Sequence, residues 1–304
     1  MQTENFVIQS QFDNLEIHGV MICPENPKAI IQILHGMCEY KERYEDFMRF
    51  FAEQGYVVVC HDHRGHGDSV KDEKDRGFLY DFSGTAVVED AALITRYVKE
   101  RYPDLPVYLF GHSMGSMIAR CYLQKYDTLV DKAVICGSPS ENPLVNVAIL
   151  LAKTVRLFRG ERYKSKMLAY LSTGKGNERF KEEGPSNWLS RNRENIEKFI
   201  TNPKGKVHFS ANGYENLFKL MRQTYRKKDY RVQNPTLPIF FVSGSDDAVL
   251  VNEKKWRASV NDMKKVGYQN VSSKLYPKLR HEIFNDIGGE VVMQDLLTFF
   301  NGAV

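Results

Sequence analysis

A serine between two glycines is the group of residues in this chain best placed for chemistry. Residues 109–115 read LFGHSMG, so Ser113 stands between Gly111 and Gly115 in a G-x-S-x-G pattern. An apolar run precedes the pattern and an amphipathic helical pattern follows it, which is the strand–turn–helix context of a nucleophile elbow. Side chains two residues from the serine would clash in so tight a turn, and glycine removes that clash. We therefore predict that Ser113 is a nucleophile for acyl transfer.

A serine hydroxyl is a weak nucleophile at neutral pH, so it needs a histidine base that is oriented by a carboxylate. In proteins with this elbow, the carboxylate and then the histidine follow the serine along the chain. Of the eight histidines, only His281 follows the strand pattern that resumes near residue 238. Asp246 and Asp247 follow that resumed strand, and the residues alone do not decide between them.

Two backbone N–H groups are predicted to stabilise the oxyanion. In the α/β-hydrolase arrangement, one comes from the loop after an early buried strand and the other from the residue after the nucleophile. The early strand ends in residues 33–37 (ILHGM), which nominates the N–H of Met37, and Met114 follows the nucleophile. We expect His35, in the same loop, to brace it through hydrogen bonds and not to act as a second base.

The spacing of apolar residues predicts the elements that position these groups. Short apolar runs with β-branched residues are typical of buried strands, and they occur at 29–34, 56–60, 107–110, 133–136 and 238–243. A further strand is predicted at 271–276. Three- and four-residue spacing predicts helices over 44–54, 85–101, 114–126, 252–266 and 289–300. An antiparallel hairpin at a sheet edge is predicted from residues 6–8 and 15–22. Strands that alternate with helices predict an α/β-hydrolase fold with a mainly parallel sheet flanked by helices.

The alternation stops between residues 138 and 231, where the charge also changes. This segment holds 20 Lys and Arg against 9 Asp and Glu, a net charge of +11, whereas the rest of the chain carries −7. Its pattern is largely helical, with a loop expected at 174–177 (GKGN). We therefore predict an α/β core of residues 1–137 and 232–304 and an inserted basic helical cap of residues 138–231.

Composition limits the remaining classes of protein. With 42% hydrophobic and 26% charged residues among 304, the chain is neither disordered nor fibrous. No stretch reaches about 18 uninterrupted apolar residues, and the first residues lack the pattern of a signal peptide. Five cysteines without CxxC spacing are typical of reduced thiols. We therefore expect a cytoplasmic protein with no metal and no cofactor, and we expect no nucleic-acid partner because the basic cap lacks a basic–aromatic stacking pattern.

The chain resembles the monoglyceride lipase and lysophospholipase group of α/β hydrolases, also described as serine-aminopeptidase-like hydrolases. The matching residues run in order from about residue 29 to 285. They are His35-Gly36, Glu39, Arg43-Tyr44, 62–69 (DHRGHGDS), 111–115 (GHSMG), 244–247 (GSDD) and 280–283 (RHEI). In that family the acid stands three residues after the glycine, which implies Asp247 as the acid of a Ser113–Asp247–His281 triad. The stretch 62–69 is a structural signature of the family and is left out of the site.

The resemblance implies a carboxylic-ester hydrolase that acts on a single-chain lipid ester, a monoacylglycerol or a lysophospholipid, through an acyl-enzyme intermediate. The pair Met37-Cys38 departs from the small residues usual in the family, which we expect to narrow the mouth of the acyl site. We expect Cys38 to be a buried, inert thiol. Two alternatives stay open: an aminopeptidase or amidase with the same triad, and a non-catalytic small-molecule-binding protein on the same fold.

One helix of the cap permits two interpretations. Its apolar residues recur at helical spacing with basic residues nearby: Leu144, Val147, Leu151, Val155 and Phe158, with Lys153, Arg156, Arg159 and Arg162. Such a basic amphipathic helix can make transient contact with an anionic membrane surface. The alternative, which we favour, is an ordinary cap helix that packs over the pocket with its basic residues in solvent. Both interpretations fit an apolar acyl tunnel under the cap.

Overall fold

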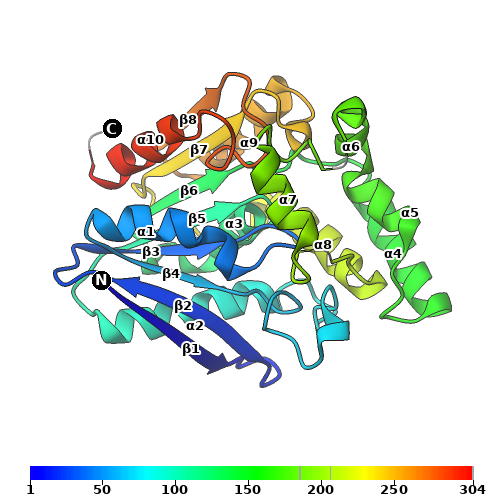
Figure 1. Cartoon of the computed structure of the whole chain (residues 1–304), viewed down its shortest axis with the longest axis horizontal. Helices are drawn as coiled ribbons and strands as arrows, with labels where there is room; N and C mark the ends of the chain where they lie inside the picture. Colours follow the sequence, from blue (N-terminus) through cyan, green and yellow to red (C-terminus); the bar gives the residue numbers. More distant parts are fainter. Residues whose placement is uncertain (185, 206, 303–304) are drawn as a thin grey trace.

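A single sheet runs through the middle of the protein. The computed structural model describes residues 1–184, 186–205 and 207–302, and the side chains of Lys175, Asn177 and Glu182 lie outside the described set. Within these residues, eight strands pair in the order β1-β2-β4-β3-β5-β6-β7-β8 (Figure 1). The strands are β1 (Gln2–Gln9), β2 (Glu16–Cys23), β3 (Ala29–Leu34), β4 (Tyr56–His61), β5 (Val107–His112), β6 (Lys132–Cys136), β7 (Ile239–Gly244) and β8 (Val271–Tyr276).

The sheet is mixed, with most of its strands parallel. Strand β2 pairs antiparallel with both β1 and β4, and all other neighbours are parallel. The predicted edge hairpin and mainly parallel sheet are therefore confirmed. The core helices also lie where the spacing predicted them: α1 (Glu45–Glu53), α2 (Ala86–Arg101), α3 (Met114–Tyr126), α9 (Glu253–Val266) and α10 (Glu290–Phe300).

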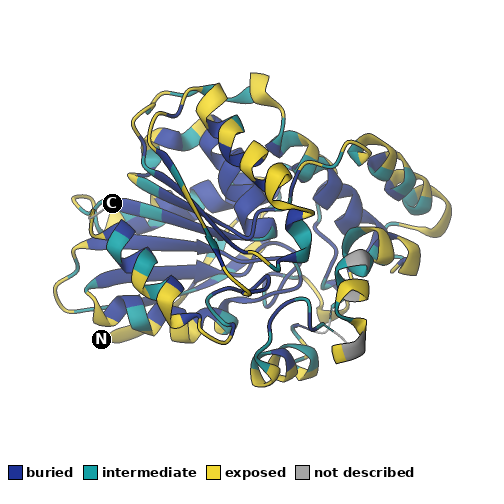
Figure 2. Ribbon diagram, turned by 90° about the horizontal axis from the view of Figure 1, so that it is seen from above, coloured by how far each residue is buried: buried dark blue, intermediate teal, exposed yellow. Residues whose placement is uncertain are grey.

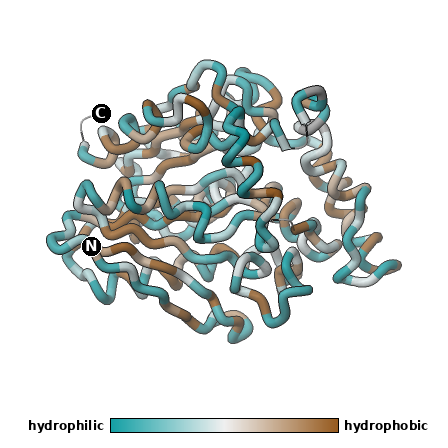
Figure 3. The backbone as a smooth tube through the Cα atoms, in the orientation of Figure 1, coloured by the Kyte–Doolittle hydropathy of each residue, from teal (hydrophilic) through white to brown (hydrophobic). Residues whose placement is uncertain are grey.

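Helices cover both faces of the sheet because alternate strand residues point to opposite sides. Ile30 of β3 lies in a core with residues of α2, α3 and α9, whereas its neighbour Ile31 lies in a second core with residues of α1 and α10. Figure 3 shows the central strands as the most hydrophobic part of the chain, and Figure 2 shows them as buried. This two-sided burial explains why the parallel strands read as continuous apolar runs in the sequence.

The cap segment, residues 138–231, is inserted between β6 and β7 and lies at the right of Figure 1. Its helices are α4 (Val145–Arg159), α5 (Lys166–Ala169), α6 (Lys175–Arg179), α7 (Arg193–Thr201) and α8 (Ala211–Thr224). Helix α4 packs on α8, and α8 packs on α3 of the core. Helix α6 contacts η7 (Ala248–Leu250), the turn that follows β7. The cap segment therefore touches the core beyond the carboxyl end of the sheet.

The loop expected at residues 174–177 is wrong. Residues Tyr170–Gly174 form a π-helical turn, and α6 continues from it over Lys175–Arg179. These glycines lie in helical turns and pack against neighbouring side chains, Gly174 most closely. A Cβ on Gly174 would lie 2.4 Å from the Tyr170 ring, and a Cβ on Gly176 would lie 3.4 Å from both Ala248 and Trp188. The contacts of Gly176 with Ala248 and Trp188 could not be predicted from the neighbouring sequence.

The favoured packing of the first cap helix is wrong in part. Ile149 and Ala152 of α4 are buried, and Leu151 and Val155 pack against the same core from partly buried positions. Five further apolar side chains of this region face solvent, with exposures of 60% to 82%: Leu144, Val147, Leu150, Leu157 and Phe158. We call these five residues the exposed face of α4. The predicted stripe is divided because apolar residues occupy two sides of the helix and α8 covers one of them.

The described helices include no segment long and apolar enough to cross a membrane.

Candidate active site

Ser113 occupies a strained turn between β5 and α3. Its φ and ψ are 54° and −116°, a conformation that non-glycine residues rarely adopt. The flanking glycines permit very close approaches. A Cβ on Gly115 would lie 1.9 Å from the carbonyl oxygen of Leu34, and one on Gly111 would lie 2.4 Å from that of Gly115. The strand–turn–helix context predicted for Ser113 is therefore present, and Ser113 is partly exposed.

The imidazole of His281 is held by a buried carboxylate. Its Nδ1 lies 3.0 Å from both Oδ1 and Oδ2 of Asp247, and each of the two residues is 2% exposed. The Ser243 hydroxyl donates to Asp247 Oδ2, and the Val249 N–H donates to Oδ1, both at 3.0 Å. These donors fix the carboxylate, and the carboxylate orients the imidazole so that its other nitrogen, Nε2, is left for a second partner.

Asp246 points away from His281. Its side chain is 42% exposed and lies 3.7 Å from Arg179. The turn after β7 decides which carboxylate turns inward, since the Asp247 N–H donates to Gly244 O while the Asp246 N–H donates to Leu279 O. The structure thus brings Asp247 to His281 and leaves Asp246 in solvent.

Two further glycines place the loop after β3 next to Ser113 and residue 137 next to His281, and the His112 ring lies near both glycines. A Cβ on Gly36 would lie 3.2 Å from Ser113 Cβ. A Cβ on Gly137, which has a φ of 56°, would lie 3.3 Å from Nδ1 and Cε1 of His281. Both sites are glycine because a side chain would crowd these groups.

The two N–H groups nominated for the oxyanion belong to the residues next to Gly36 and Ser113. Met37 follows Gly36 directly, and Met114 is the first residue of α3, whose N-terminal dipole favours negative charge. Within the described part of the chain, neither N–H donates a hydrogen bond, whereas the Gly36 N–H donates to Glu39 Oε2 at 2.6 Å. An oxyanion hole requires two free donors of this kind beside the serine.

Glu39 ties the loop after β3 to the elbow. Besides the Gly36 N–H, its Oε2 accepts the Tyr44 hydroxyl at 2.9 Å and lies 3.1 Å from Nδ1 of His112. Arg43 Nε donates to its other oxygen at 3.2 Å. Burial opposes charge on Glu39, but His112 and Arg43 outweigh it and hold the pKa of this carboxyl well below its ordinary value. The sequence indicated Glu39 only through the family pattern and assigned it no contact.

Residues 62–69 make contacts that hold the loop after β4 in place. Asp62 accepts the backbone N–H of Lys41 at 2.7 Å and its ammonium at 2.8 Å, and a Cβ on Gly67 would lie 2.1 Å from Asp62 Cγ. The Ser69 hydroxyl donates to the carbonyl of Asp62 at 2.8 Å. These contacts close a tight turn, which agrees with leaving this stretch out of the site.

Two side chains of the loop after β3 behave as the sequence led us to expect. His35 lies 2.8 Å from the carbonyl of Gly36 through Nδ1 and accepts the His63 N–H through Nε2 at 3.0 Å, so it braces the loop. Burial raises the pKa of the Cys38 thiol to about 12, so this residue stays protonated and inert at neutral pH.

Four fully buried histidines pack together beside this turn: His35, His61, His63 and His66. The rings of His35 and His63 lie 4.1 Å apart, and His63 Nδ1 lies 3.2 Å from His61 Nε2. Burial lowers the pKa of all four, to about 3 for His61 and about 4 for His66. Among the described residues, no group of three or more His, Cys, Asp or Glu is arranged to hold a metal ion.

We expect the free energy of unfolding to fall as the pH drops below about 6.5. The unfolded chain takes up a proton at each of these histidines near that pH, whereas the folded chain leaves them neutral, so acid favours unfolding. Each histidine should cost about 1.4 kcal/mol per pH unit in this window. His112 works in the opposite direction, because Glu39 outweighs the effect of burial and raises the pKa of this histidine.

Urea unfolding at about pH 7.5, 6.5 and 5.5 checks this expectation. His61→Gln removes one buried titrating group, so its stability should decline less steeply than wild type by about 1.4 kcal/mol per pH unit. His18→Gln replaces a partly exposed histidine of β2 outside this buried group and is measured as the control for histidine substitution. Identical slopes for all three proteins would contradict the assignment.

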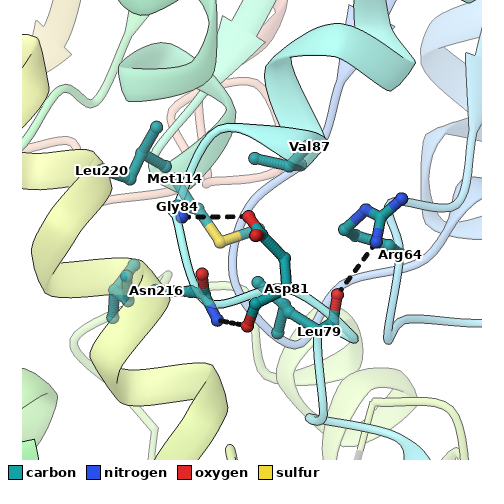
Figure 4. A pocket seen from close by; sticks show the side chains of 9 residues that line it. Arg64, Leu79, Asp81, Gly84, Val87, Met114, Asn216 and Leu220 are labelled. Carbon is teal, nitrogen blue, oxygen red and sulfur yellow. Dashed lines mark hydrogen bonds between the residues drawn. The ribbon is translucent and has the colours of Figure 1, made fainter. Parts of the chain in front are cut away.

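A small cavity lies beside the elbow helix, with a volume of about 10 Å³. Met114 lines it together with Val87 and Leu220 (Figure 4), and Leu217 is a further lining residue. Its polar rim is tied up by internal hydrogen bonds, such as that of the Gly84 N–H to Asp81 at 2.9 Å. This space holds about one water molecule. The expected acyl tunnel is thus not open at this point.

Fold and site geometry define the class of protein: the chain is an α/β hydrolase of the esterase and lipase type. A carboxyl esterase from Bacillus coagulans, in complex with glycerol, superposes with a TM-score of 0.88 at 27% identity, and the match covers 99% of both chains. The family model described as "Serine aminopeptidase, S33" matches residues 25–288, so the chain belongs to that family.

Curated relatives carry the names of lipid hydrolases. The chain is 27% identical over 287 residues to a monoacylglycerol lipase of Mycolicibacterium smegmatis, covering 93% of this chain and 91% of the relative. It is 30% identical over 209 residues to a Haemophilus influenzae protein named "Probable lysophospholipase L2", covering 66% of each. The family resemblance expected from the motifs is therefore confirmed.

Proposed function

We propose that this protein is a serine carboxylic-ester hydrolase that acts on single-chain lipid esters, either monoacylglycerols or lysophospholipids. The observation that carries the proposal is the buried Asp247–His281 pair beside a serine in a strained elbow, with 3.0 Å between His281 Nδ1 and the carboxylate. The names of the two curated relatives support lipid esters as the substrate class.

Acylation uses the three side chains in sequence. Because Nδ1 of His281 faces Asp247, its Nε2 is the nitrogen that takes the proton of Ser113 while the hydroxyl oxygen attacks the ester carbonyl. The carbonyl oxygen becomes an oxyanion, which accepts hydrogen bonds from the N–H groups of Met37 and Met114. The imidazolium then gives its proton to the departing alcohol, and the acyl group stays on Ser113.

Deacylation repeats these steps with water. Neutral His281 removes a proton from a water molecule, which attacks the acyl carbonyl and passes through a second oxyanion in the same place. Collapse of this intermediate transfers the proton back to Ser113 and releases the carboxylic acid. Asp247 stays ionised throughout and keeps the imidazole in the tautomer that both halves need.

An acyl chain requires space that the cap segment must provide. The cavity beside Met114 is lined by Leu79, Val87, Leu217 and Leu220, which suits a hydrocarbon chain in character, but its volume of about 10 Å³ does not admit one. We infer that Leu217 and Leu220 of α8 move away from Met114 when substrate binds. The cap thereby selects for long apolar chains, because only these replace the packing that is lost.

The substrate class is tested by comparing fatty-acid release from a long-chain monoacylglycerol and a long-chain lysophosphatidylcholine with p-nitroaniline release from an aminoacyl p-nitroanilide. Ser113→Ala is the blank in each assay. Release from either lipid that depends on Ser113 supports the proposal, and the ratio of the two identifies the alcohol part. Cleavage of the anilide alone would favour the aminopeptidase alternative. Activity confined to acetate esters, with a steep fall as the acyl chain lengthens, would contradict a lipid substrate.

We also propose that the cap segment makes transient contact with anionic membranes through the exposed face of α4. Phe158 is 82% exposed and Leu157 is 65% exposed near the C-terminal end of this helix. Lys153 and Arg159 are exposed beside them. Arg156 and Arg162 contribute less, because they pair with Glu215 at 2.7 Å and Asp75 at 2.6 Å within the protein.

Co-sedimentation with vesicles tests this contact. Leu157→Asp combined with Phe158→Asp should weaken binding to phosphatidylglycerol-containing vesicles about tenfold or more, since two large side chains lose their apolar environment. Val291→Asp alters a comparably exposed residue of α10, outside the cap segment, and should bind as wild type does. Equal binding by both variants would count against α4 as the contact.

A further inference from the structure

The cap segment reaches the proposed catalytic base through a tryptophan. The indole of Trp188 lies against the imidazole of His281, with 4.9 Å between ring centroids and 31° between the ring planes. The His112 ring lies 4.8 Å from the same imidazole. His281 is therefore enclosed by aromatic rings and is 2% exposed, while Ser113 stays partly open to substrate.

Backbone groups on both sides of Trp188 bind both sides of His281. The carbonyl oxygen of Asn187 accepts a hydrogen bond from Nη1 of Arg280 at 2.6 Å. The carbonyl oxygen of Leu189 accepts the Glu282 N–H at 2.7 Å. The indole is thus not a chance neighbour, since residues 187–189 and 280–282 are joined at both ends of the contact.

A second set of contacts holds the same two segments together. Nη2 of Arg280 lies 2.7 Å and 2.8 Å from the two carboxylate oxygens of Glu183. The Arg280 guanidinium lies 3.9 Å from the centre of the Phe180 ring. Arg280 is 6% exposed, and a buried charge of this kind needs its partner in place. The loop that carries His281 is consequently anchored to the cap segment through its neighbour Arg280.

An indole face next to an imidazole matters most when the imidazole is charged. The negative face of an aromatic ring attracts a cation within about 6 Å, and indole is the strongest of the aromatic side chains in this respect. In acyl transfer the histidine becomes an imidazolium as the oxyanion forms. The charged groups around His281 are Asp247, which it contacts, His112 paired with Glu39, Glu282 paired with Arg43 at 2.6 Å, and Arg280 paired with Glu183.

We propose that Trp188 is a positioning residue for His281, which stabilises its imidazolium form and makes the triad competent only when residues 187–189 of the cap segment lie against residues 280–282. The inference rests on the proposed role of His281 as base. It gives the cap segment a part in the chemical step in addition to substrate selection. Substrate entry that moves this segment would then also alter the base.

Kinetics on a water-soluble ester such as p-nitrophenyl butyrate provide the first test. Trp188→Leu should lower kcat about tenfold with little change in KM, and it should move the acid limb of the pH profile of kcat/KM to lower pH by about half a unit to one unit. The shift has this sign because the imidazolium of the free enzyme loses its aromatic partner and gives up its proton more readily. Trp188→Phe, which keeps an aromatic face, should recover most of the rate.

Tryptophan emission provides a second readout that does not depend on turnover. Trp188 and Trp256 are the two tryptophans of the sequence, and Trp256 is buried. The difference in emission between wild type and Trp188→Phe belongs to Trp188, and an imidazolium in contact quenches indole emission. This emission should fall with decreasing pH at the midpoint of the acid limb, and His281→Gln should abolish the change.

Tyr170→Leu is the matched control, since it replaces a half-exposed aromatic residue of the cap segment that is not among the rings around His281. It should leave both the pH profile and the emission titration as in wild type. The inference would be overturned if the acid limb of the pH profile did not move in Trp188→Leu. It would also be overturned if Trp188 emission did not change with pH. If Trp188→Leu does not fold, the emission of wild type, Trp188→Phe and His281→Gln decides. A wild type without esterase activity would refute the proposed function, and the emission titration would still test the stacking.

Discussion

Replacing Ser113 with alanine should lower kcat for ester hydrolysis on the order of 10⁵-fold or more, and it should abolish covalent labelling by a fluorophosphonate. The reason is that the acyl-enzyme needs an oxygen nucleophile at this atom, and removal of the nucleophile from a serine–histidine–aspartate unit costs nearly its whole contribution. Alanine keeps the Cβ, so the strained backbone at φ 54° is equally costly in both proteins. The folded structure should therefore survive, which thermal unfolding checks.

A second serine, which directly follows Gly137, controls for the loss of a serine hydroxyl. Ser138 follows β6, and its hydroxyl is buried without a hydrogen-bond partner among the described residues. Ser138→Ala should label normally and retain activity within about threefold, as expected for a residue without a chemical role. Hydrolysis that persists in Ser113→Ala would show that the nucleophile lies elsewhere. Labelling of Ser113→Ala by the fluorophosphonate would carry the same meaning.

The adjacent carboxylates Asp246 and Asp247 offer a second test with a large expected difference. Asp247→Asn should lower kcat about 10⁴-fold, because the amide no longer holds the imidazole in the tautomer that accepts the serine proton. Asp246→Asn should change kcat by less than about twofold, because that side chain is 42% exposed and pairs only loosely with Arg179 at 3.7 Å. The two changes are chemically identical and one residue apart.

The measurement is kcat and KM for p-nitrophenyl butyrate with each variant, together with fluorophosphonate labelling rates. KM should stay close to wild type in both, since neither carboxylate is placed to touch the acyl chain. A large loss in Asp246→Asn, or a small one in Asp247→Asn, would reverse the assignment of the acid. Equal losses in both would point to damage to the turn after β7, which the Ser243 hydroxyl and the Val249 N–H help to hold.

Much of the scaffold follows from local sequence. Most of the parallel strands were predictable because they are buried on both faces and are therefore rich in apolar residues, as in residues 29–34, where only Gln32 is polar. The elbow was predictable because a backbone approach of 1.9 Å to a would-be Cβ leaves glycine as the sole choice at residue 115. The predicted bounds of these strands and helices differ from the observed bounds by only a few residues, because each element follows a regular apolar spacing.

Contacts made by the cap segment were harder to predict. The glycines at 174 and 176 suggested a loop, yet they lie in helical turns, and the Tyr170 ring leaves no room for a Cβ at residue 174. The stripe on α4 suggested one packed face, yet its apolar residues lie on two sides of the helix. The α4 pattern was misread because the helix that covers one of these sides, α8, comes from a distant part of the chain.

The sequence by itself determined the fold class, the order of the strands and helices, and the positions of Ser113 and His281, because these depend on local spacing and on glycine at fixed distances. It did not separate Asp246 from Asp247 without the family pattern, because neighbouring residues share a composition and differ only in which way a turn directs them. The tertiary structure alone decided that Asp247 faces the imidazole, that Glu39 joins the loop after β3 to His112, and that Trp188 lies on His281. Each of these is a contact between segments dozens of residues apart, and only the folded chain brings such side chains together.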